Sequence, residues 1–369
     1  MTSQSTSTAN AAATATAAST TPAPPAAPAA PPPGRFLKAV RAVAVLACLP
    51  YVALKVAWVA GSEVGIPRGS SLLDDRATMA VANSLTVLMD AAVVVLALLL
   101  TQAWGMRVKA WLLALPMWAA TGLLAPIMVG FPLQLLVRAL GGGSSTAAAD
   151  GSGAFLDEWV FGVVYTGFIV QGLALGVLFT AYARRRWGRL WRGSVGELPC
   201  SGSTRAAQRT AATAAAVLAL LPATMHALWA CGAATGLDSG RIAQRTGDFH
   251  AVEAMHVLFA AATVAGVLML AFRRGRTLPL KVPLALAWVG SGAMACWGGW
   301  LSLAALTGVE DLADRPTALM SLTYAVQMIV GMLVITIGAY FFAERTHRAE
   351  SAHSTERTHF TEHAAARRP

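Results

Sequence analysis

The sequence predicts an all-α, polytopic membrane protein whose eight transmembrane helices form two parallel four-helix repeats with disordered termini. Three observations lead to this fold class: an apolar composition, eight long apolar segments and a motif that occurs twice. Of the 369 residues, 56% are hydrophobic and only 12% are charged, and the mean hydropathy is +0.57. A soluble domain of this length needs more charged surface.

Eight apolar segments are long enough to cross a membrane, because a helix spanning a hydrocarbon core of about 30 Å needs about 20 apolar residues. The segments are roughly 37–60, 79–102, 109–131, 159–182, 211–234, 253–272, 281–305 and 318–342. Backbone groups in lipid must be paired within their own segment, so each segment is expected to be a helix. The segments lack the alternation of apolar and polar residues that a membrane β-barrel requires.

Composition divides the chain into five parts. We expect a disordered, Ala/Pro/Thr-rich cytoplasmic tail at 1–34, a first membrane repeat at 35–182, a basic cytoplasmic linker at 183–209, a second membrane repeat at 210–342 and a disordered cytoplasmic tail at 343–369. The two tails are polar or of low complexity, and such segments bury too little apolar surface to fold.

A seven-residue motif reads KVAWVAG at 55–61 and HALWACG at 226–232. Both copies have Trp at the fourth place and Gly at the seventh, whereas the first place holds Lys55 in one and His226 in the other. Each half has an even number of helices, so both halves enter the membrane from the same side, as a parallel duplication does. We expect the two motif tryptophans to belong to an aromatic belt at the outer membrane surface.

The net charge of +10 follows the predicted topology. Lys and Arg gather in the loops at 183–209 and 273–281, whereas the alternate loops are neutral to acidic. The positive-inside rule therefore places the basic loops, and both termini, in the cytoplasm of a protein of the cell membrane. This distribution argues for the lipid bilayer, and against nucleic acid, as the partner of the basic residues.

Ionisable residues inside the spans are the main functional candidates, because each costs about 2.5–3.5 kcal/mol at the centre of a membrane helix. As cavity or ligand-binding residues we identify Lys55, Asp90, His226, Glu253 and His256. Helix rise places Asp90 near mid-depth and the other four toward the outer side. Lys55 has two further interpretations, in which it extends to the lipid headgroups or pairs with Asp90.

His250, Glu253 and His256 are spaced so that all three can share one face of a helix. Two imidazoles and a carboxylate suit a divalent transition metal. The two His are six residues apart, however, whereas familiar zinc-binding helices space them by four. The alternatives are polar residues that line a cavity and a helix start at the membrane interface. We therefore expect no cofactor at this site, and a divalent metal or haem is the alternative.

The motif at 226–232 resembles a His-x-x-Trp-x-x-Gly motif of uncharacterised four-helix membrane proteins of bacteria, and the whole chain resembles a tandem pair of such units. The resemblance implies the plan of each half and no particular activity. The eight-helix plan is also similar to that of haem A synthase, a family that places a His pair in each half. Here the first half has no His, so this comparison fails at the residues that would hold haem.

Three classes of function remain. The working hypothesis is binding or transport of a small or amphipathic molecule through an outward-facing polar cavity. The alternatives are a non-catalytic membrane protein that acts through partners and a metal- or haem-dependent membrane enzyme. The sequence contains no phosphate-binding loop, GxSxG or HExxH motif, which disfavours ATP-driven transport by this chain and the common hydrolase chemistries.

Overall fold

The protein is helical throughout the part of the chain that its structure, a computed structural model, describes. Within that part, eight helices are long and apolar enough to cross a membrane, and no strand occurs beyond an isolated bridge between Ser194 and Pro279. These helices confirm the predicted fold class. The described residues are 34–68, 70, 76–141, 156–198, 204–243, 245–306 and 315–365. The predicted N-terminal tail lies outside them except for Gly34.

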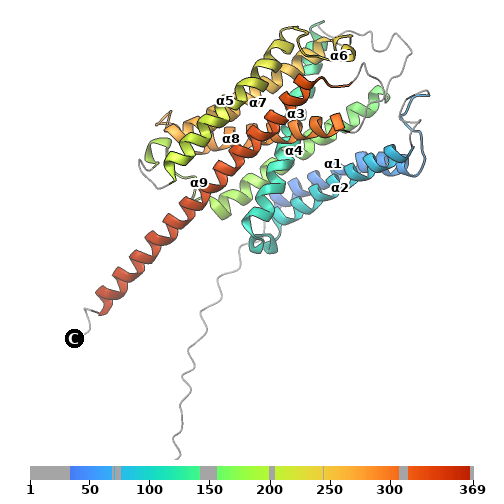
Figure 1. Cartoon of the computed structure of the whole chain (residues 1–369). Coiled ribbons are helices and arrows are strands. Elements are labelled where there is room, and N and C mark those ends of the chain that lie inside the picture. Colours follow the sequence, from blue (N-terminus) through green and yellow to red (C-terminus); the bar gives the residue numbers. More distant parts are fainter. Residues whose placement is uncertain are drawn as a thin grey trace, which may run out of the picture. The chain divides into compact units, whose positions relative to one another are not determined.

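The first four spans are α1 (Arg35–Val59), α2 (Arg76–Thr101), α3 (Ala110–Ala139) and α4 (Glu158–Trp187), with the short 3₁₀ helix η2 (Ala103–Arg107) between α2 and α3. In this half α1 packs against both α2 and α4, and α3 packs against α4. Figure 1 shows α1 and α2 side by side along their length.

The last four spans are α5 (Arg205–Ala230), α7 (Gly247–Phe272), α8 (Lys281–Leu306) and α9 (Ala318–Ala365), and a short helix, α6 (Ser239–Ala243), lies between α5 and α7. Here α5 packs against α7 and α9, and α8 packs against the same two helices. The two halves meet where α3 contacts α8 and α7.

The last helix differs from the prediction at its C-terminal end. The apolar segment ends near residue 342, and the sequence predicts a disordered tail from 343 onward, whereas α9 continues to Ala365. Ala, Glu and Arg recur in the added turns, and these residues have high helix propensity. Extension of a helix that already exists also avoids the cost of nucleating a new one.

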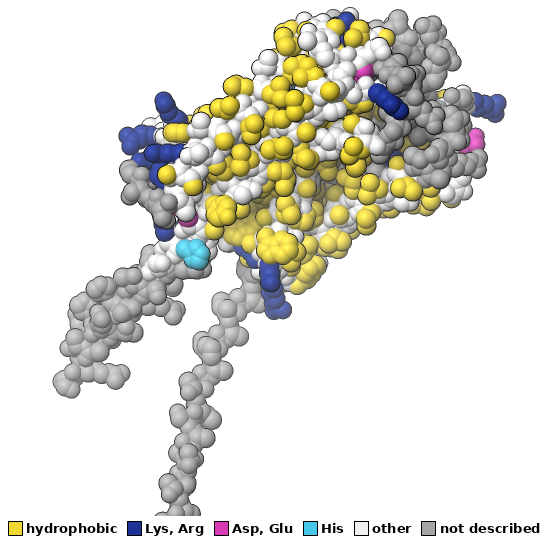
Figure 2. All heavy atoms as spheres, viewed as in Figure 1, with side chains coloured by type: hydrophobic (Ala, Val, Ile, Leu, Met, Phe, Trp, Pro, Cys, Tyr) yellow, Lys and Arg dark blue, Asp and Glu magenta, His cyan; other side chains and the backbone are white. Residues whose placement is uncertain are grey.

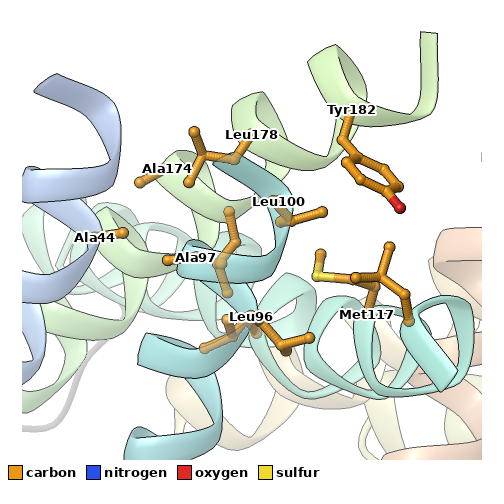
Figure 3. Close-up of a cluster of buried hydrophobic side chains, with 11 residues drawn as sticks. Ala44, Leu96, Ala97, Leu100, Met117, Ala174, Leu178 and Tyr182 are labelled. Carbon is orange, nitrogen blue, oxygen red and sulfur yellow. The ribbon is translucent and has the colours of Figure 1, made fainter. Parts of the chain in front are cut away.

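The core and the outer surface are both apolar, as expected of helices in lipid. Figure 3 shows one buried cluster of the first half, in which Ala44 of α1, Leu96 of α2, Met117 of α3 and Leu178 of α4 meet. Hydrophobic side chains also cover the helices on the face seen in Figure 2. Exposed side chains such as Leu88 are suited to acyl chains rather than to water.

The halves meet backbone to backbone at Gly122 of α3 and Gly292 of α8. A Cβ atom on Gly122 would lie 2.8 Å from the Cα of Gly292, and a Cβ on Gly292 would lie 3.1 Å from the Cα of Gly122. In lipid, helices associate through van der Waals contact, which small residues at the crossing point allow. These two glycines therefore set how closely the halves approach.

Two tryptophans, one on each helix, donate hydrogen bonds across the same crossing of α3 and α8. Trp118 Nε1 of α3 donates to Ser291 Oγ of α8 at 3.0 Å, and Trp288 Nε1 of α8 donates to Thr121 Oγ1 of α3 at 3.4 Å. Each indole thus bonds to the hydroxyl beside the glycine of the opposite helix. This exchange is the pattern of a two-fold, isologous contact.

The two ends of the membrane bundle are fastened differently. At one end, residues 193–196 of the linker form three backbone hydrogen bonds of 2.9–3.0 Å with residues 276–280, between α7 and α8. At the other end, Arg138 Nε of α3 donates to Asp248 Oδ2 of α7 at 2.8 Å. The two basic loops therefore lie together, away from the end at which α1 and α5 finish.

Gly122→Ala is expected to lower the midpoint of thermal unfolding of the detergent-purified protein, because the new methyl group overlaps the backbone of α8. Overpacking of this kind costs about 1–3 kcal/mol. Gly176→Ala in α4 is the matched control, since a Cβ there meets no atom within 4 Å. Scanning fluorimetry should show a drop for the first variant only, and equal midpoints would contradict the tight crossing.

Candidate functional site

The two copies of the repeated motif have the same local structure. Trp58 Nε1 donates to the carbonyl of Val64 at 2.7 Å, and Trp229 Nε1 donates to the carbonyl of Thr235 at 2.9 Å. The glycines at the seventh place of the motif have positive φ angles, 92° at Gly61 and 90° at Gly232. Four residues further on, Gly65 and Gly236 both have a φ of 75°. Each indole thus closes the turn that follows its helix.

This geometry corrects the expectation of an aromatic belt. Trp58 and Trp229 are 3% and 0% exposed, so neither ring lies against lipid headgroups. A buried indole N–H needs an acceptor, and the carbonyl six residues ahead supplies it in both copies. The tryptophans therefore fix the end of each helix, and the residue at the first place of the motif turns into the bundle.

In the second half, four buried polar side chains form one hydrogen-bonded group, the second-half cluster: His226 of α5, Glu253 and His256 of α7, and Gln327 of α9. His226 Nδ1 and Glu253 Oε2 share a hydrogen bond of 2.5 Å. His226 Nε2 bonds to Gln327 Oε1 at 2.9 Å, and Gln327 Nε2 bonds to His256 Nδ1 at 3.4 Å. The two imidazole rings stack with their centroids 4.4 Å apart.

These bonds determine where protons reside. Gln327 Oε1 is an acceptor, so His226 Nε2 carries a hydrogen, and His256 Nδ1 accepts from the amide and is unprotonated. The bond between His226 Nδ1 and Glu253 Oε2 needs one further proton, held by either partner. The pair is neutral overall in both cases, which lowers the cost of burying it. One exchangeable proton thus lies between two side chains from different helices.

Two tryptophans flank the second-half cluster. Trp229 stands edge-on to His226 with ring centroids 5.2 Å apart, and Trp297 of α8 stands edge-on to His256 at 6.5 Å. Trp297 Nε1 also donates to the carbonyl of Leu123 in α3 at 3.2 Å. The cluster is therefore connected, through one side chain, to the helix at which the halves meet.

His250 belongs to the same face of α7 but not to the cluster. Its Nδ1 lies 3.0 Å from the carbonyl of Trp229, one turn along α5 from His226. In the part of the chain that the structure covers, no group of three or more His, Cys, Asp or Glu side chains is arranged to hold a metal ion. The predicted set His250, Glu253 and His256 is thus divided between a backbone contact and the cluster.

Lys55 of the first half takes the place that His226 has in the second. Its Nζ donates to Asn83 Oδ1 of α2 at 2.6 Å and lies 5.0 Å from the ring centroids of Tyr51 and Trp58. Among the described residues it forms no ion pair with Asp90, and it does not extend away from the protein to headgroups. The contact of Lys55 with Asn83, between α1 and α2, therefore resembles the contact of His226 with Glu253, between α5 and α7, in place but not in chemistry.

Asp90 lies in a separate group, the first-half cluster, which comprises Cys48 of α1, Asp90 of α2 and Gln171 of α4. Gln171 Nε2 donates to Asp90 Oδ1 at 3.1 Å and to Cys48 Sγ at 2.9 Å. All three side chains are buried. The five candidate residues therefore divide between two sets of helices.

Sequence reasoning missed the amides. Asn83, Gln171 and Gln327 bond to predicted residues, yet a search limited to ionisable groups passes over them. Gln171 and Gln327 are each the sole amide side chain of a long apolar segment. That isolation was an available signal, because polar side chains in membrane helices bond across to neighbouring helices.

No protein-family model, curated protein or solved structure significantly matches this chain. The two clusters and the membrane setting of the helices are therefore the features that bear on its function.

Contact between His226 and Glu253 predicts strong coupling in a double-mutant cycle. His226→Gln and Glu253→Gln should each destabilise the protein by about 1–3 kcal/mol, because each leaves a buried partner unpaired. The double variant should lose less than the sum, by about 1 kcal/mol or more. SDS-induced unfolding measures the cycle. The control pair, Glu253→Gln with Lys55→Met in the other half, should be additive, and additivity of the first pair would contradict the contact.

Proposed function

We propose that this integral membrane protein binds a small or amphipathic molecule at the second-half cluster and transports it or presents it at the membrane. One observation carries the proposal: three helices bring His226, Glu253, His256 and Gln327 together inside an apolar bundle. Burying such groups in a membrane span is costly, and apolar side chains of similar size would hold the same helices together at lower cost.

The cluster's chemistry favours a cationic ligand. Glu253 supplies a carboxylate, and the rings of Trp229 and Trp297 stand beside the two imidazoles. Aromatic rings attract organic cations, and a carboxylate in the same cluster supplies the opposite charge. Such a ligand takes the place of the proton that His226 and Glu253 share. Binding of one positive charge then releases one proton, which keeps the buried site neutral.

The topology supports access from outside the cell. The positive-inside rule assigns the joined basic loops to the cytoplasm, and the cluster is near the opposite end, four residues before α5 finishes at Ala230. The matched turns of the two motif copies and the reciprocal tryptophan bonds between α3 and α8 support a parallel duplication. We infer that the second copy is the one specialised for the ligand, since its motif begins with His226 where the first copy has Lys55.

A metal- or haem-dependent enzyme is the second candidate, favoured by the close stacking of His226 and His256. Both nitrogens of His226 are already hydrogen-bonded, to Glu253 and Gln327. A metal ion would therefore have to displace one of these partners. Elemental analysis and the visible spectrum of the purified protein distinguish the candidates, because a stoichiometric metal or a haem band lost in His226→Gln would favour the enzyme.

The cation-binding proposal is tested with tritiated tetraphenylphosphonium, an amphipathic cation, on the detergent-purified protein. Glu253→Gln should weaken its binding about tenfold or more, which is the effect of about 1.4 kcal/mol. His256→Gln should weaken it as well, whereas the same change at His250, on the same helix but outside the cluster, should not. Wild-type binding no tighter than that of Glu253→Gln would contradict the proposal.

Proton release is a second readout of the same site. Addition of the cation to weakly buffered protein should lower the pH in proportion to the ligand bound, because the shared proton leaves. Asp248→Asn removes a carboxylate from the first turn of the same helix and should leave the release unchanged. Binding without a pH change would exclude the exchange of cation for proton.

A further inference from the structure

Two oxygen atoms of the first-half cluster have no hydrogen-bond partner among the described residues. They are Asp90 Oδ2 and Gln171 Oε1, on side chains that are only 3% and 1% exposed. Unpaired buried acceptors are rare because each one forfeits its hydration. Two of them on adjoining side chains call for a common explanation.

The orientation of the Gln171 amide is determined by its neighbours. Its nitrogen donates to Asp90 Oδ1 and to Cys48 Sγ, and the Cys48 thiol donates to the carbonyl of Ala44 at 3.3 Å. A reversed amide would direct its oxygen at the Asp90 carboxylate, so electrostatic repulsion disfavours it. Gln171 Oε1 is therefore the free acceptor, beside a carboxylate that accepts only one hydrogen bond.

No side chain forms an ion pair with Asp90 among the described residues, and the charge of Lys55 acts on it from beyond ion-pair distance. Lys55 donates to Asn83 instead. Cys48, Asp90 and Gln171 all lie near the middle of their helices, the most costly depth for a lone charge. The carboxylate is therefore favourably placed to take up a proton or a cation.

A proton on Asp90 is one way to satisfy these oxygens. A protonated Oδ2 is a donor, and it would satisfy both atoms only by donating to Gln171 Oε1. A cation uses both oxygens at once. One carboxylate balances one positive charge, so a monovalent ion gives a neutral site, whereas a divalent ion would leave a net charge in a low-dielectric interior.

We propose that Asp90 Oδ2 and Gln171 Oε1 bind a sodium ion at the centre of the first half. Oxygen atoms are the ligands that hard cations take, and small cations bind near the midplane of membrane proteins where helices offer such oxygens. This site is distinct from the second-half cluster in its helices, its ligands and its charge. It does not rest on the proposed function.

The test measures stability and ion binding of the full-length, detergent-purified protein. Thermal unfolding is followed in NaCl, KCl and choline chloride at equal ionic strength, and ²²Na⁺ binding is measured directly. We expect the midpoint to rise with sodium and to saturate, because an ion that binds only the folded state stabilises it by mass action. Potassium and choline should have a smaller effect.

Asp90→Asn keeps the shape of the side chain and removes its charge. It should weaken ²²Na⁺ binding about tenfold or more and abolish the sodium-dependent rise in midpoint. Asp157→Asn, the same substitution at the start of α4, should keep both. If Asp90→Asn does not fold, Gln171→Glu provides a second variant, which should alter sodium affinity by adding charge at the site.

Three outcomes would overturn the proposal. The first is an identical midpoint in all three salts for the wild-type protein. The second is a sodium effect that persists in Asp90→Asn. The third is stabilisation by acid alone with no ²²Na⁺ bound, which would assign a proton to Asp90 instead.

Discussion

The backbone contact between Gly122 and Gly292 is the constraint on which the arrangement of the halves depends. In lipid there is no hydrophobic force to press two helix bundles together, so close packing has to hold them. The contact brings Trp297 to the carbonyl of Leu123, and the same ring stands beside His256. The second-half cluster is thus connected to the crossing of α3 and α8 by a single aromatic side chain.

The membrane helices were predictable because length and hydropathy alone specify a span. Helix rise also predicts that His226 and His256 lie at similar depth, and the two rings stack on each other. Their partners were not predictable in the same way. Gln327 is 101 positions from His226 in the chain, and only the packing of α5 against α9 joins them. The prediction that the motif tryptophans form an aromatic belt was wrong for a related reason, since composition does not distinguish an interfacial ring from a buried one.

The two halves differ in the polar side chains that bond between their helices. Lys55 of α1 bonds to Asn83 of α2, and His226 of α5 bonds to Glu253 of α7. The last helix of each half then contributes differently. Gln327 bonds directly to His226, whereas Gln171 bonds to Asp90 and Cys48 and does not reach Lys55. One half consequently has a continuous polar group and the other has two separate ones, which sequence alignment of the motif does not reveal.

The pairing of residues 193–196 with residues 276–280 has a consequence for how the chain is divided. By sequence these linker residues follow the first half, but by contact they belong to the second. These hydrogen bonds therefore fix the linker to the second half. The linker then keeps the two bundles close together and raises the effective concentration of each bundle for the other. This pairing would join two separately made bundles only if the break fell between residue 196 and α5, because a break before residue 193 would leave both paired segments in the second bundle.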